Sequence, residues 1–87
     1  MMNKIYAGIG ARALPESVAD FFIHLGRELA NDGWTLRSGA ADGADAAFEK
    51  GCDISGGVKE IYLPWKEFNG HPSHLFEQTR SFAKRSP

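Results

Sequence analysis

The stretch from Tyr6 to Pro15, YAGIGARALP, places two glycines and an arginine directly after an apolar run. Gly8, Gly10 and Arg12 could together hold a phosphate, because glycines let an anion approach backbone N–H groups and a guanidinium donates paired hydrogen bonds to its oxygens. The alternative is structural: the glycines form a tight turn and Arg12 is solvated. Because the spacing satisfies only a loose G-x-G-x-x-A pattern, both interpretations stay open at this point.

A second group of small and polar residues occupies positions 37–45, RSGAADGAD. We expect a helix to begin there, capped by Asp42 with Asp45 reaching back, and a helix N-terminus favours anions. As a cap, the Asp42 carboxylate would repel a phosphate, but a carboxylate here could instead accept hydrogen bonds from ribose hydroxyls. The structural alternative, that both acids only cap the helix, stays open. The candidate ligand-binding residues of this segment are Arg37, Ser38, Gly39, Asp42, Gly43 and Asp45.

Other side chains that could bind a metal or act as nucleophiles give weaker indications of a functional site. His71 and His74 stand three positions apart with no third ligand nearby, so we predict no metal site. Ser38 has no recognisable base partner, and the single cysteine, Cys52, lacks an activating environment. We therefore predict neither a catalytic nucleophile nor a bound cofactor.

The composition limits the classes of protein to which this chain can belong. The chain has 87 residues, of which 43% are hydrophobic, with ten basic and eleven acidic residues and a net charge of −1. These values predict one folded domain and argue against a strongly basic nucleic-acid binder. No stretch approaches the roughly 18 apolar residues of a membrane-spanning helix, and the start lacks a signal-peptide core. We expect a cytoplasmic protein.

The loops that carry these residues follow predicted strands. Apolar periodicity and Gly or Pro punctuation predict short strands over 4–9, 34–38 and 60–63 and helices over 15–32, 42–51 and about 72–85. The order β-α-β-α-β-α predicts a Rossmann-like, three-layer α/β fold with a short parallel sheet of about three strands. Ligands on such sheets bind at the carboxyl ends of the strands, where loops 8–14, 38–45 and 64–70 would gather.

Three stretches, YAGIGARALPESV, GWTLRSGAADGADAAFEKG and IYLPWKEFNG, together resemble the SLOG superfamily. This group of Rossmann-like domains includes the DNA-processing protein DprA (Smf) and the LOG-type nucleotide phosphoribohydrolases. The chain is most similar to the DprA-like proteins of phages and bacteria that are named after DNA recombination-mediator protein A. The similarity runs from about Lys4 to Gly70, and its most specific part is the block SGAADGAD.

The resemblance implies that the glycine-containing loops bind a nucleotide or a nucleic-acid phosphate. Gly8, Gly10 and Arg12 match the first loop of the family, and the six candidates at positions 37–45 match the second. It also implies that residues 1–87 correspond to the N-terminal half of a full SLOG domain. The P-G-G-x-G-T-x-x-E motif of the LOG-type hydrolases does not occur, so we expect no catalysis.

Three functions follow from this comparison. The preferred one is a non-catalytic module that binds a nucleotide or nucleic-acid phosphate, DNA included. The alternative is a small phage-type inhibitor that binds a protein of a host defence complex. A nucleotide phosphoribohydrolase is the least favoured. Because the first strand, IYAGI, has neither charge nor proline to protect it as a sheet edge, we also expect a homodimer.

Overall fold

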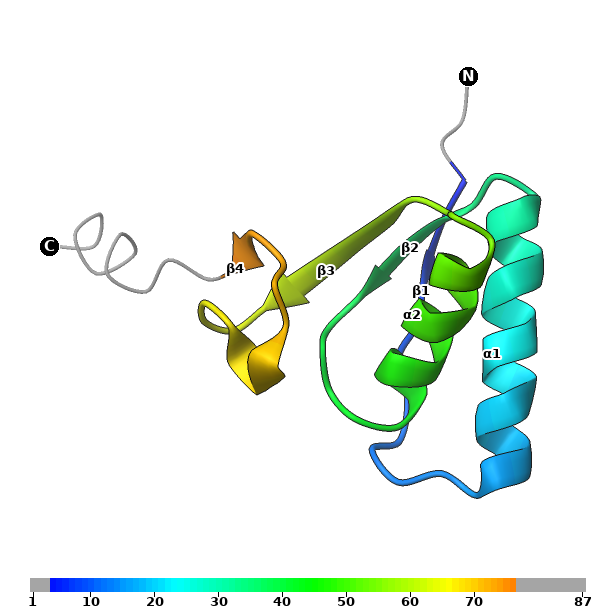
Figure 1. Cartoon of the computed structure of the whole chain (residues 1–87), viewed down its shortest axis with the longest axis horizontal. Helices are drawn as coiled ribbons and strands as arrows, with labels where there is room; N and C mark the ends of the chain where they lie inside the picture. The colour runs from blue at the N-terminus through cyan, green and yellow to red at the C-terminus, as the bar shows by residue number, and fades with distance from the viewer. Residues whose placement is uncertain (1–3, 77–87) are drawn as a thin grey trace, which may run out of the picture.

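The computed structural model describes residues 4–76 of the chain. Four strands, β1 (Ile5–Ala7), β2 (Thr35–Ser38), β3 (Lys59–Leu63) and β4 (Leu75–Phe76), alternate with two helices, α1 (Glu16–Asn31) and α2 (Ala44–Ile54), and a short helical turn, η1 (Phe68–Gly70) (Figure 1). The α/β class and the parallel sheet are confirmed, with one strand more than expected.

The sheet follows the chain: its order is β1-β2-β3-β4, and every neighbouring pair is parallel. Because the order never reverses, two right-handed crossovers place both helices on the same face of the sheet. Figure 1 shows α1 and α2 side by side on one side of the strands, and the two helices pack closely against each other. The described residues therefore supply two of the three expected layers.

Helix α1 ends as its sequence predicts. Gly33 has a φ of 84°, the left-handed conformation that glycine adopts without strain. Its N–H donates to the carbonyl of Ala30, and the N–H of Trp34 donates to that of Leu29, each at 3.0 Å. These paired bonds form a Schellman motif, which turns the chain directly into β2.

The core lies between the sheet and the helix pair. Leu36 and Cys52 are fully buried, and Ile61 and Leu63 of β3 are 2% exposed. Gly51 lets α2 approach α1, because a Cβ at this position would overlap the carbonyl oxygen of Ile23. The closely packed helix pair and sheet thus support the loops at the carboxyl edge of the strands.

The expected helix over about 72–85 is wrong for its first residues. Leu75 and Phe76 form β4, which pairs in register with Tyr62 and Leu63 of β3. The Ser73 hydroxyl donates to the Ile61 carbonyl at 2.5 Å and accepts from the Leu75 N–H at 3.1 Å, which fixes the start of the strand. The rest of the expected helix, residues 77–85, lies outside the described part of the chain.

Candidate functional site

The loops that follow β1, β2 and β3 meet at the carboxyl edge of the sheet, as the sequence predicts. The N–H of Ala44 donates to the carbonyl of Ala11 at 2.9 Å, which joins the first loop to the second. The Asn69 amide donates to the Ala40 carbonyl at 2.7 Å, which joins the third loop to the second. This edge is the candidate site.

The glycines of this edge serve loop packing. Gly43 has a φ of 80°, and a Cβ there would overlap the carbonyl oxygens of Ala11 and Arg12. A Cβ at Gly10 would lie 2.8 Å from the Cβ of Ala44. At Gly8 it would lie 2.6 Å from Leu36, so Gly8 faces the core. Close packing thus explains all three glycines without a ligand.

Ser38 is buried, and its hydroxyl donates to the carbonyl oxygen of Gly8. This bond ties the end of β2 to the end of β1. Since the hydroxyl already has a partner, Ser38 supports the site rather than facing a ligand.

The structure does not bring Arg12 and Arg37 together. Arg37 points to the sheet face opposite the helices, where its Nε donates to Glu60 at 2.8 Å. The hydrogen bond from Arg37 holds the pKa of the Glu60 carboxyl below its ordinary value. Arg12 instead lies on the helix side, at the rim of a groove of about 480 Å³ whose other members include Leu14, Ile23 and Lys50.

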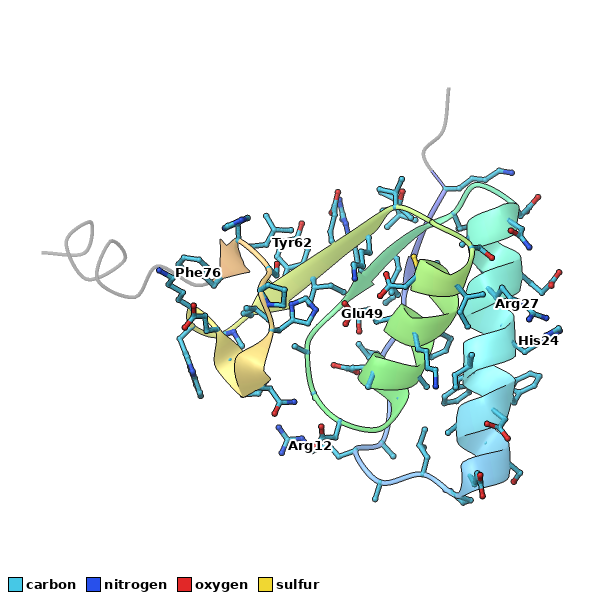
Figure 2. The ribbon with its side chains drawn as sticks, in the orientation of Figure 1. Arg12, His24, Arg27, Glu49, Tyr62 and Phe76 are labelled. Atoms are coloured by element: carbon cyan, nitrogen blue, oxygen red, sulfur yellow. The ribbon has the colours of Figure 1, made fainter. Side chains whose placement is uncertain are left out.

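Arg12 is exposed, and no salt bridge within residues 4–76 involves it. Figure 2 shows its side chain extending away from helix α1, on the side where the β3–β4 connection lies. Its guanidinium is therefore available to an anion at the carboxyl edge.

The expected cap by Asp42 is wrong. The N-cap of α2 is Gly43, and no side-chain hydrogen bond caps this helix. Asp42 stands one position earlier, where its carboxylate accepts from the Asn69 amide at 3.2 Å. The reason is a contact between the loops. The Ala11 carbonyl accepts a hydrogen bond from the N–H of Ala44, the first residue of α2, so that Gly43 occupies the N-cap position.

Asp45 lies in the first turn of α2 and is only 9% exposed. Its Oδ2 faces Gly39, where an added Cβ would lie 3.0 Å away. None of the side-chain hydrogen bonds within residues 4–76 involves its carboxylate. Its oxygens keep some contact with solvent, since the Tyr6 hydroxyl is the one fully buried polar side-chain atom of residues 4–76 that lacks a hydrogen-bond partner. The carboxylate is therefore free to accept a hydrogen bond at this edge.

The sequence analysis missed a cluster around Glu49, which Figure 2 shows between α2 and the β3–β4 connection. One oxygen of this carboxylate accepts from Lys59 and from His71, each at 2.6 Å. Burial opposes its ionisation, but these two hydrogen bonds outweigh burial and lower the pKa of Glu49. The cluster anchors the connection that carries Asn69.

The hydrogen bonds of His71 define its tautomer. The N–H of Ser73 donates to Nδ1 at 3.0 Å, so Nδ1 is an acceptor and the ring proton stands on Nε2, which faces Glu49. The sequence did not predict the contact between His71 and Glu49, because the two residues lie on different elements. The spacing of His71 and His74 indicated only a weak pair of metal ligands. Residues 4–76 contain no group of three or more His, Cys, Asp or Glu side chains that could hold a metal ion.

Comparisons with protein-family models, with curated proteins and with solved structures found no match for this chain. Neither described helix combines the length and the apolar character needed to cross a membrane.

Proposed function

We propose that the carboxyl edge of the sheet binds a nucleotide or a nucleic-acid phosphate without catalysing a reaction, in a cytoplasmic setting. The observation that carries this proposal is the uncapped start of α2 beside Arg12. Ala11 accepts the N–H of Ala44, and no side chain caps the N–H groups of Asp45 and Ala46 that follow. Helix N-termini in this state attract anions, and a neighbouring guanidinium strengthens the attraction.

Asp45 and Asp42 favour a nucleotide over a bare phosphate. A carboxylate repels an isolated anion but accepts hydrogen bonds from ribose hydroxyls, and both acids lie beside the proposed phosphate position. Gly39, which lies directly beside the Asp45 carboxylate, completes the proposed contact set with Arg12, while Gly10 and Gly43 shape the surrounding loops by close packing. We leave three candidates out of the contact set. The side chains of Arg37 and Ser38 already have hydrogen-bond partners, and Gly8 faces the core. The resemblance to SLOG domains supports the same ligand class.

The proposal is tested by calorimetric titration with AMP, ADP, ATP, inorganic phosphate and a single-stranded oligonucleotide. We expect Arg12→Ala to weaken nucleotide binding about 10- to 100-fold, the effect of losing one charge-assisted hydrogen bond. Arg27→Ala is the matched control, because Arg27 lies on α1 and contacts His24. Asp45→Asn should weaken the binding of nucleotides, which lose a ribose acceptor, but strengthen the binding of inorganic phosphate, because the repulsion by this carboxylate is removed.

Two results would count against this function. One is the absence of binding by all five probes at millimolar concentration. The other is equal affinity of the wild type and Arg12→Ala for the best probe. In thermal unfolding, a specific ligand at a hundredfold excess over its Kd should add about 2.7 kcal/mol to the free energy of unfolding.

A second candidate function, inhibition of a host protein by direct binding, has one observation in its favour. Large apolar side chains are exposed on the described surface, among them Trp65 and Tyr62, which are 58% and 51% exposed. Exposed aromatic residues are enriched at protein interfaces. Binding of a protein that persists in Arg12→Ala, together with no nucleotide binding, would favour this alternative.

A further inference from the structure

One face of the sheet is uncovered in the described part of the chain. Parallel sheets are almost always covered on both faces, yet α1 and α2 share one face, and no other element of residues 4–76 covers the opposite one. Strand alternation places Ala7, Arg37, Glu60, Tyr62 and Leu75 on this open face. We call this surface the open face.

The open face is rich in apolar area. Tyr62 and Leu75, neighbours in register on β3 and β4, are 51% and 41% exposed. Val58 and Ile9, which continue the same alternation beyond β3 and β1, are 64% and 65% exposed. Large exposed apolar side chains on one face, two of them adjacent, are typical of a surface that another molecule covers.

The charges of the open face are balanced and paired. At its centre the Arg37 Nε donates to Glu60 at 2.8 Å, and the Tyr62 hydroxyl donates to the same oxygen at 2.9 Å. Lys4 and Asp32 form a second pair at 3.7 Å. These two cations and two anions, with Ile5, Gly33 and Thr35, surround a hollow of about 550 Å³.

This balance argues for one kind of partner. A partner with a strongly acidic or strongly basic surface would make one repulsive contact with the open face for every attractive one. A copy of the same face, turned by a two-fold axis, can set its Arg37 against Glu60 and its Glu60 against Arg37. The apolar residues around the charges then meet their own counterparts.

We propose that a second copy of this chain covers the open face, in a two-fold symmetric dimer centred on Arg37 and Glu60. This contact is separate from the proposed nucleotide site, because Arg12 and Asp45 lie at the carboxyl edge and on the helix side. The dimer should bury at least about 1,200 Å² in total, the lower limit for a stable interface.

The test uses charge reversal, with mass measured by light scattering after gel filtration. The wild-type chain should have the mass of a dimer at high micromolar concentration. Arg37→Glu and Glu60→Arg, each alone, place like charges across the two-fold axis and should raise the Kd of the dimer at least tenfold. An equimolar mixture of the two variants restores both attractive contacts and should form a heterodimer.

The mixture makes the test independent of folding, since two unfolded variants would not restore each other's association. Phe21→Asp is the control, because Phe21 is 58% exposed on α1, away from the open face, and this variant should remain a dimer. A wild-type monomer at high micromolar concentration overturns the proposal and leaves residues 77–87 or another protein to cover the face. Variants that each stay dimeric also overturn it, because the dimer would then use another surface.

Discussion

At the scale of single residues, Asp42 and Gly43 are neighbours with very different expected effects on stability. Gly43 has φ 80° and ψ −124°, and its Cα faces two carbonyl oxygens of the first loop. Gly43→Ala should therefore lower the free energy of unfolding by about 3 kcal/mol or more. Asp42→Ala removes one exposed contact with Asn69 and should change it by less than about 0.5 kcal/mol.

Urea unfolding of the two variants measures this difference. Had Asp42 been the cap, its loss would cost about 1 kcal/mol. A loss of that size in Asp42→Ala, with Asp42→Asn unchanged, would restore the capping interpretation that the structure contradicts.

Tyr6 offers a second prediction at this scale. Its ring packs edge-on against Phe48, and its buried hydroxyl has no hydrogen-bond partner within residues 4–76. Burial, with a smaller effect of Cys52, raises the pKa of Tyr6 from 10.0 to about 12. Because removing an unpaired buried hydroxyl relieves a desolvation cost, Tyr6→Phe should keep or raise stability at pH 7.

The same pKa shift gives stability a dependence on alkaline pH. The folded pKa of Tyr6 lies above the unfolded value, so its contribution is complete below pH 10 and is lost as the pH rises toward 12. We expect the urea midpoint of the wild type to fall more steeply over this range than that of Tyr6→Phe. Parallel curves for the two proteins would contradict this.

At the scale of elements, the contact between α1 and α2 depends on Gly51. Helix propensity alone predicts that Gly51→Ala stabilises the chain by roughly 1 kcal/mol. The structure predicts the opposite, because the added methyl would overlap the backbone carbonyl of Ile23, which cannot move without shifting α1. We expect a net loss of about 2 kcal/mol in urea unfolding, whereas Lys50→Ala, on the exposed side of α2, should be nearly neutral.

The connection from β3 to β4 depends on Glu49. The Glu49 side chain is 14% exposed and accepts from Lys59 and His71, so Glu49→Gln should cost roughly 1.5–3 kcal/mol. Asp53→Asn is the matched control, because Asp53 also pairs with Lys59 but is 52% exposed. Its loss should cost less than about 1 kcal/mol.

Glu49 also makes stability sensitive to acid. Its folded pKa lies below the ordinary 4.5, so its contribution is complete above that value and is lost as the pH falls through the folded pKa. The gap in urea midpoint between the wild type and Glu49→Gln should therefore close on acidification. A gap that stays constant from pH 7 to the acid range would show that the charge of Glu49 is not what stabilises the connection.

The elements show what local sequence can and cannot predict. Apolar spacing together with Gly33 predicts α1 and its end, because every bond of that motif is local. Leu75 and Phe76 fit a helical spacing equally well, but pairing with Tyr62 and Leu63 of β3 decides in favour of a strand. Glu49 and His71 were missed for the same reason: their contact joins elements that sequence spacing does not relate.

At the scale of the whole molecule, the layers were harder to predict than the elements. A β-α-β-α order is compatible with helices on either face, and the strand order alone decides between them. The loops were expected to meet because parallel strands end at one edge, and they do. The separation of Arg12 from Arg37 depends on strand alternation, which puts Arg37 on the face opposite the core residue Leu36.

The proposed dimer makes thermal stability depend on protein concentration. Mass action should add up to about 1.4 kcal/mol for each tenfold rise in concentration, which corresponds to roughly 4 °C or more in Tm for a domain of this size. The Tm of Arg37→Glu alone should not change with concentration. Equal concentration dependence in both proteins would argue against the open face as the contact.

The strand order β1-β2-β3-β4 also determines how the molecule can be built during synthesis. Each new strand pairs with the one that left the ribosome just before it, so no strand has to wait for a distant partner or be inserted between two others. The first β-α-β unit can collapse while the rest is still being translated, and it then serves as a template for the next. We therefore expect refolding to lack the strand-insertion steps that reversed strand orders require.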